Sequence, residues 1–150
     1  MIMRLAVFAA AVMFATGSAW AASEAEVNAR IDQVLGDHSV YETAITAFQA
    51  AVSNGQKADV AAFVRYPIRV EVNGRRRTIR TSKAFVRDYD GIMTPDIVDA
   101  VKTQKYADLF VNDRGIMFGK GEVWINGICL DRACKRFVPQ VETIQHTDGR

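Results

Sequence analysis

Arginine and lysine side chains are concentrated in one short stretch of the chain. Between Arg65 and Arg87 there are eight cations and a single acid, Glu71. Guanidinium groups bind phosphate, carboxylate or sulfate through forked hydrogen bonds. The stretch therefore predicts a surface for an anion or an acidic partner, with a solvated, charged hairpin as the plainer interpretation. The residues assigned to this anion- or partner-binding set are Arg69, Arg75, Arg76, Arg77 and Arg80.

A second group combines carboxyl and aromatic side chains that could line a pocket. In such a pocket, a carboxylate removed from water has a raised pKa and can serve as a general acid or base. The alternative is that the aromatic residues belong to an ordinary core and that the acids are solvated. The candidate ligand-binding residues are Tyr66, Tyr89, Asp90, Glu122 and Trp124.

The two histidines complete no catalytic or metal-binding pattern. His38 and His146 lie far apart in the sequence, and neither stands beside Ser, Cys or a carboxylate in the spacing of a nucleophile site. We therefore assign no catalytic residue, no metal ligand and no cofactor, and we expect both histidines at the surface.

Cys129 and Cys134 are the only cysteines. In an oxidising compartment an even count predicts a disulfide, here between two strands. So small a loop restrains the unfolded chain by about 2 kcal/mol. The alternatives are a redox site, which prefers Cys-x-x-Cys before a helix, and a metal site, which needs more ligands.

The N-terminus has the pattern of a secretory signal peptide. Arg4 precedes an apolar run of about 11 residues, which is shorter than the roughly 20 that cross a bilayer. Ala19 and Ala21 match the small-x-small rule, so we expect cleavage after Ala21 and a protein in the periplasm or secreted. An uncleaved anchor is the alternative, and no stable membrane insertion is expected after cleavage. The expected division is residues 1–21 as signal peptide and 22–150 as one domain, ordered over about 24–144.

Composition narrows the class of protein further. The chain has 150 residues, of which 49% are apolar and 24% charged, with a net charge of +2. These values exclude a disordered tail, a collagen-like repeat and a disulfide-dense scaffold. Cleavage would remove Arg4 and leave a nearly neutral protein. Because no aromatic residues interleave the arginines, nucleic acid is not an expected partner.

The hydrophobic period changes along the chain from that of helices to that of strands. Ser39 and Glu42 form a predicted capping box at the start of the second helix, and Ser82 is expected to cap a later one. Asn73-Gly74 predicts a tight hairpin turn. Helices are expected over 25–36, 39–53 and 57–65 and from Ser82 and Pro95; strands are expected over 68–72, 75–81, 109–111, 116–118, 122–130 and 135–144.

The order of these elements predicts the fold class. Helices, a hairpin, further helices and then three or four antiparallel strands imply an α+β protein with helices on one face of a sheet. Gly115, Gly119, Gly121 and Gly127 allow bulges and bends, so the sheet is expected to be curved.

Two segments carry a resemblance to a known superfamily. They are residues 63–68 (Phe-Val-Arg-Tyr-Pro-Ile) and 119–124 (Gly-Lys-Gly-Glu-Val-Trp). Over roughly residues 40–145 the chain resembles small exported bacterial proteins that are similar to the cystatin-like cone fold of the nuclear-transport-factor-two superfamily. The resemblance implies N-terminal helices packed on a curved antiparallel sheet. Because that superfamily includes dehydratases, isomerases, immunity-type proteins and binding modules, the resemblance implies no single activity.

These observations favour a binding or interaction protein over an enzyme. The expected ligand is a small apolar or anionic molecule, or the partner is a periplasmic protein. One alternative is a small hydrolase or dehydratase that uses Asp90 or Glu122 as its base. The other is an inhibitor or immunity-type protein that sets the arginine hairpin against an acidic surface.

Overall fold

The structure is a computed structural model, and it describes residues 23–147. The predicted signal peptide and the cleavage site after Ala21 lie outside the described residues. Across residues 23–147, the helices lack the combination of length and apolar character that a bilayer crossing requires.

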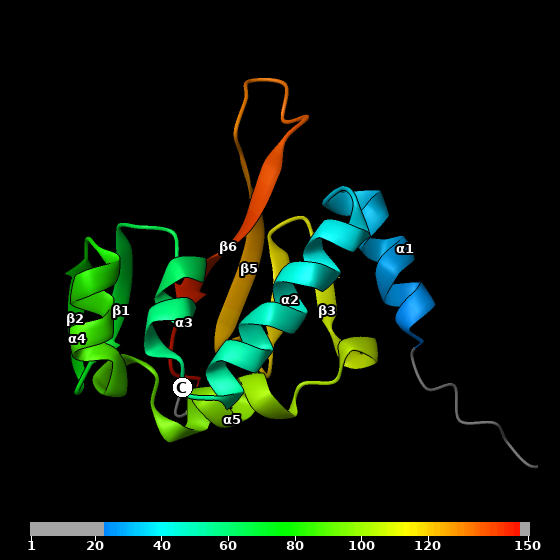
Figure 1. The fold of residues 1–150 in the computed structure, drawn as a ribbon. Helices are drawn as coiled ribbons and strands as arrows, with labels where there is room; N and C mark the ends of the chain where they lie inside the picture. The colour runs from blue at the N-terminus through cyan, green and yellow to red at the C-terminus, as the bar shows by residue number, and fades with distance from the viewer. Residues whose placement is uncertain (1–22, 148–150) are drawn as a thin grey trace, which may run out of the picture.

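Helices and strands are segregated along the described chain, which confirms the predicted α+β class (Figure 1). The helices are α1 (Glu24–Val34), α2 (His38–Ser53), α3 (Lys57–Phe63), α4 (Ser82–Ile92), α5 (Pro95–Thr103) and the 3-10 helix η1 (Tyr106–Asp108). The strands are β1 (Ile68–Val72), β2 (Arg75–Ile79), β3 (Phe110–Asn112), β4 (Gly115–Phe118), β5 (Val123–Cys129) and β6 (Phe137–Ile144).

The strands form two antiparallel sheets. β3, β4, β5 and β6 make a four-stranded sheet in chain order, as predicted for the C-terminal half. β1 and β2 make a separate hairpin, whose turn residues Asn73 and Gly74 have φ angles of 52° and 77°. Positive φ at both positions is what the Asn-Gly pair supplies, so the predicted hairpin is confirmed.

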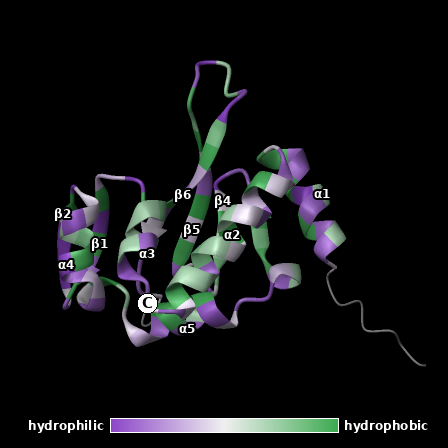
Figure 2. Cartoon of the chain, viewed as in Figure 1, coloured by the Kyte–Doolittle hydropathy of each residue, from purple (hydrophilic) through white to green (hydrophobic). Residues whose placement is uncertain are grey.

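Helix α2 crosses one face of the four-stranded sheet and forms the centre of the core (Figure 1). The Phe48 ring on α2 lies 5.7 Å from the Phe63 ring and 5.8 Å from the Phe118 ring. Phe48, Phe118 and Tyr41 are almost completely buried, so side chains occupy the space between α2 and the sheet. In Figure 2, hydrophobic residues follow α2 and the sheet, whereas β2 and α4 carry many hydrophilic ones.

The β1–β2 hairpin is attached beside β6. Val64 forms a parallel bridge with Val141 of β6, and the Arg65 backbone N–H donates to the Val141 carbonyl at 2.9 Å. The Arg65 guanidinium also pairs with the Glu142 carboxylate. On its other side β1 packs against α4, which contributes the buried Phe85 to the core. The β1–β2 hairpin therefore lies next to the C-terminal half of β6 at the surface of the molecule.

The predicted capping box at Ser39 is wrong. The N-cap of α2 is Asp37, whose carboxylate accepts hydrogen bonds from the backbone N–H and the hydroxyl of Ser39 at 2.9 and 2.7 Å. α1 ends at Val34, and Gly36, at a φ of 111°, lies in the turn that joins it to α2. Ser39 is thereby the second residue of the helix, where its side chain is itself a donor to the cap.

Three further details differ from the sequence prediction. α1 begins with a capping box that was not predicted, in which Ser23 and Glu26 exchange hydrogen bonds. α4 is capped by Thr81, whose hydroxyl accepts from the Ala84 N–H at 3.2 Å, and Ser82 is its first residue. The 3-10 helix η1 precedes β3, where no helix was predicted.

Candidate functional site

A surface groove of about 370 Å³ lies between the β1–β2 hairpin and the C-terminal end of β6. We call it the arginine groove, because three of the five predicted arginines line it. Its lining residues are Arg69, Val70, Glu71, Arg76, Arg77, Thr78, Thr143, Ile144, Gln145 and His146. The groove thus joins two segments that are about seventy positions apart in the sequence.

Strand alternation places two of the arginines on the same face of the hairpin. In β1, Val70 is buried and the neighbouring Arg69 is exposed, so the two side chains point to opposite faces. Arg69 lies opposite Thr78, and Glu71 lies opposite Arg76. Directly opposite residues share a face, so Arg69 and Arg76 both point to the groove side of the hairpin, with Glu71 beside them.

The third arginine is already engaged. Arg77 lies 3.6 Å from the Asp88 carboxylate, which also accepts two hydrogen bonds of 3.0 Å from Arg87. Hydrogen bonds from Arg87, and then the charges of Arg87 and Arg77, lower the pKa of Asp88 against an opposing effect of burial. Within residues 23–147, by contrast, no ion pair involves Arg69 or Arg76.

The remaining two predicted arginines do not line the groove. Arg75 lies next to the hairpin turn, opposite Val72, and Arg80 follows the end of β2. Both are exposed. The structure therefore divides the predicted anion-binding set into groove residues and residues that serve as charge-matched controls.

Tyr89 is a buried residue of α4, and Tyr66, which is partly buried, packs against the same part of the core. Their rings are 6.3 and 6.0 Å from that of Phe85. The Tyr66 hydroxyl donates to the Ala61 carbonyl at 2.9 Å, and burial raises the pKa of Tyr66 to about 12. The Tyr89 hydroxyl is buried and has no hydrogen-bond partner among the residues that the structure describes. Both tyrosines thus occupy the core positions that the alternative interpretation expected.

Asp90 is a surface residue. Its side chain is 82% exposed and pairs with Lys57 at 2.7 Å. The same ammonium lies 5.3 Å from the centre of the Tyr89 ring. A carboxylate this exposed is not in the desolvated setting that general acid–base chemistry in a pocket requires.

Glu122 is buried, and its surroundings stabilise the ionised form. The carboxylate accepts hydrogen bonds from the Lys120 backbone N–H at 2.6 Å and from the Thr147 hydroxyl. Burial raises the pKa of Glu122, but these hydrogen bonds outweigh it and leave the pKa below its ordinary value. Glu122 therefore holds the turn between β4 and β5, with Asp96 and Asp99 of α5 in the same shallow groove.

Trp124 lies on the face of the sheet that is opposite to α2. Its neighbours Val123 and Ile125 are buried toward the core, so strand alternation turns the indole outward. It stands across from Met117 and Thr143, and its ring is 6.3 Å from that of the exposed Phe110. The five predicted ligand-binding residues are therefore spread over four places and do not line one cavity: the core at α4, the surface at Asp90, the β4–β5 turn and the outer face of the sheet.

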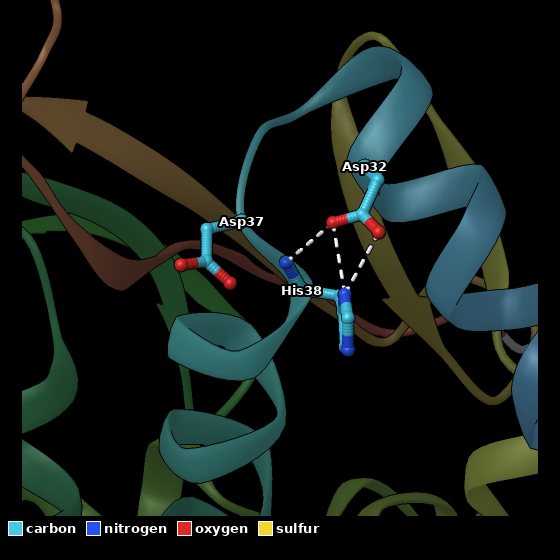
Figure 3. A group of neighbouring side chains, drawn as sticks. All are labelled: Asp32, Asp37 and His38. Atoms are coloured by element: carbon cyan, nitrogen blue, oxygen red, sulfur yellow. Dashed lines mark hydrogen bonds and ion pairs between the residues drawn. The ribbon is translucent and has the colours of Figure 1, made fainter.

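Asp32, Asp37 and His38 form a cluster that the sequence analysis missed (Figure 3). Asp32 accepts from the His38 backbone N–H at 2.8 Å and contacts its ring Nδ1 at 2.8 and 2.9 Å. These bonds, the backbone one foremost, lower the pKa of Asp32. In Figure 3 no dashed line joins the Asp37 carboxylate to this pair, although one of its oxygens lies within 4.8 Å of their ligand atoms. The Asp37 carboxylate accepts its hydrogen bonds from Ser39. The hydrogen bonds of Asp32 and Asp37 hold the turn between α1 and α2 in place. We assign no metal to the cluster.

Comparisons with protein-family models, curated proteins and solved structures found no match. The function is therefore inferred from the side chains of this chain. The arginine groove is the place where predicted residues meet, and two guanidinium groups on one face are suited to binding an anion.

Proposed function

We propose that this protein is an exported binding protein that holds a small anionic ligand in the arginine groove. One observation carries the proposal: Arg69 and Arg76 share a face of the hairpin inside a groove, with one acid, Glu71, beside them, and no ion pair among the described residues involves either arginine. Two such cations oriented together attract an anion and can donate several charge-assisted hydrogen bonds to it.

The lining of the groove favours a phosphate- or carboxylate-bearing small molecule. Thr78, Thr143 and Gln145 supply neutral hydrogen-bonding groups around the two guanidinium groups. Val70 and Ile144 also border the groove, but both side chains are buried and offer a ligand little surface. Because the groove measures about 370 Å³, it fits a metabolite-sized anion better than a macromolecule.

Export rests on the signal-peptide pattern and on the disulfide. Cys129 and Cys134 are joined, as predicted, and close the loop between β5 and β6. Disulfides persist in oxidising compartments, which supports a periplasmic or secreted protein.

The enzymatic alternative has less support than anion binding. A hydrolase or dehydratase of the predicted kind requires a desolvated carboxylate that acts as its base, and the two predicted carboxylates are Asp90 and Glu122. Asp90 is mostly exposed, and hydrogen bonds keep Glu122 ionised within a structural turn.

Titration calorimetry with inorganic phosphate and with citrate tests the proposal. We expect the wild type to bind at least one of them, more weakly as salt increases. Arg69→Ala or Arg76→Ala should weaken binding about tenfold or more, the equivalent of about 1.4 kcal/mol. Arg80→Ala removes the same charge from outside the groove and should change the affinity by less than about twofold.

Two results would contradict the proposal. The first is the absence of binding heat with both anions in the wild type at low salt. The second is an equal loss of affinity in Arg69→Ala and Arg80→Ala, because it would show attraction to overall charge and no defined site.

A further inference from the structure

The β5–β6 hairpin extends well beyond the rest of the molecule (Figure 1). β4 pairs with β5 only as far as Ile125, and the bridge from Val64 reaches β6 at Val141. Past these points the two strands pair only with each other among the described residues. We call residues 126–140 the arm. Its outer strand edges carry backbone groups that another chain could pair with.

The end of the arm has a fixed shape. The Cys129–Cys134 disulfide closes it, and the Leu130 N–H donates to the Arg136 carbonyl at 2.8 Å. The Asp131 carboxylate accepts hydrogen bonds of 3.0 to 3.1 Å from three backbone N–H groups of the loop. A loop that is held in this way loses little conformational entropy when it binds, which favours tight association.

One face of the arm carries an apolar stripe. Ile128 lies directly opposite Val138, and the hydrogen bond from Leu130 to Arg136 continues the same register by two positions. Ile128, Val138 and Leu130 therefore point to the same side. Val138 is 38% exposed and Leu130 is 58% exposed. On the reverse side Phe137 packs against Tyr41 of α2, so the stripe faces away from the body.

Positive charge surrounds the end of this stripe. Arg132, Lys135 and Arg136 are exposed, and within the described residues Arg136 alone of the three has an acidic partner, Asp131 at 3.5 Å. The Asp131 carboxylate is directed at the loop backbone. The tip therefore presents a net positive rim next to the exposed Leu130.

We propose that the arm docks onto a partner protein, with the apolar stripe in a pocket of that protein and the basic tip against acidic residues at the pocket's edge. Charge complementarity determines the sign of the partner surface, and the stripe determines its apolar centre. This surface is separate from the arginine groove, so the inference does not depend on the proposed ligand.

Two other occupants fit the arm less well. An anionic lipid surface that met the tip end-on would contact Leu130 but not Val138 further along the ribbon. A lipid surface is also fluid and has no fixed shape for a rigid loop to complement. A second copy of this chain would bring the same cations together in a symmetric contact, which is unfavourable.

Site-specific photo-crosslinking in the cells that make the protein tests this inference. A benzophenone amino acid replaces Leu130, Val138 or, as a control, the exposed Lys83 of α4, which lies away from the arm (Figure 1). We expect one discrete protein adduct from positions 130 and 138 and none from position 83. The adduct is identified by mass spectrometry, and that protein is then purified for binding measurements.

With the purified partner, the double variant Lys135→Glu/Arg136→Glu should weaken binding about tenfold or more, and added salt should weaken the wild-type complex. Leu130→Ser should also weaken it. Arg80→Glu/Lys83→Glu makes the same change of charge at two exposed positions of the body outside the arginine groove, and it should leave binding unchanged. Cys129→Ser/Cys134→Ser should weaken binding while the circular dichroism of the folded body is retained.

Several outcomes would overturn the inference. They are no adduct at 130 and 138, an equal adduct at 83, or a purified partner whose binding ignores the charge reversal. Binding to phosphatidylglycerol vesicles that is lost in Lys135→Glu/Arg136→Glu would assign the tip to a lipid surface instead. A self-adduct, with a dimer in sedimentation experiments, would assign it to a second copy.

Discussion

The ring of Phe137 lies 5.3 Å from the ring of Tyr41, and this contact fastens the base of the arm to α2. Gly127, on the neighbouring strand, lies against both rings. The absence of a side chain at Gly127 thus permits the close approach of β5 to α2. The contact links the arm, which carries the docking stripe, to the main core.

Gly127→Ala should destabilise the protein by about 1–3 kcal/mol. The added Cβ would meet the Tyr41 hydroxyl and lie 2.9 Å from the Phe137 ring, so the rings would have to shift. Urea denaturation measures the change. Gln140→Ala, on the outer side of the same ribbon, is the control and should cost less than about 0.5 kcal/mol. Equal stability of the two variants would show that the arm is not packed against α2 as described.

Tyr66, which is partly buried, and Tyr89, which is buried, should respond in opposite ways to the loss of their hydroxyls. Tyr66→Phe removes a hydrogen bond to the Ala61 carbonyl and should destabilise the protein by about 1 kcal/mol. Tyr89→Phe removes a buried hydroxyl that has no partner among the described residues, so its effect should be neutral or stabilising. Thermal unfolding of both variants checks the pair, and a larger loss in Tyr89→Phe would contradict the assignment.

Asp131 should make the stability of the arm depend on pH. The pKa of Asp131 lies below its ordinary value of 3.8, mainly because its carboxylate accepts a hydrogen bond from the backbone N–H of Lys135. Hydrogen bonds from Arg136 and Ala133 lower this pKa further, and burial raises it in part. A carboxyl whose pKa is lower when folded stabilises the protein above the unfolded pKa. That contribution is lost as the pH falls through the folded value.

The measurement compares urea midpoints of the wild type and Asp131→Asn at about pH 6 and about pH 3. At about pH 6 the wild type should have a higher urea midpoint than Asp131→Asn. At about pH 3 the difference between the two midpoints should be smaller. Asp113→Asn is the control, because that carboxylate accepts no hydrogen bond within the described chain. A gap of constant size would mean that the carboxylate charge of Asp131 does not hold the loop.

Local sequence signals predicted most of the elements. The Asn73-Gly74 turn, the strand alternation of residues 68–72 and the Cys129–Cys134 pairing each depend on neighbours a few positions apart, and all three are present in the structure. Where two local signals competed, the prediction failed. Asp37 took the cap position that was expected for Ser39, because the Asp37 carboxylate accepts hydrogen bonds from both the backbone N–H and the hydroxyl of Ser39.

The functional site was predictable only in part. The sequence identified a cluster of arginines. It could not show which of them line a groove together with His146, about seventy residues away. It likewise grouped Glu122 with Trp124, whereas strand alternation and the fold place one at a structural turn and the other on the outer face.

The sequence by itself determined the α+β order, the hairpin turn and the disulfide, because these follow from the periodicity and chemistry of neighbouring residues. Only the tertiary structure decided that Arg69 and Arg76 meet the end of β6 in a groove, and that the stripe of Leu130 and Val138 faces away from α2. Those relationships depend on which face of each strand is buried by helices distant in the chain, and packing of the whole core settles that choice.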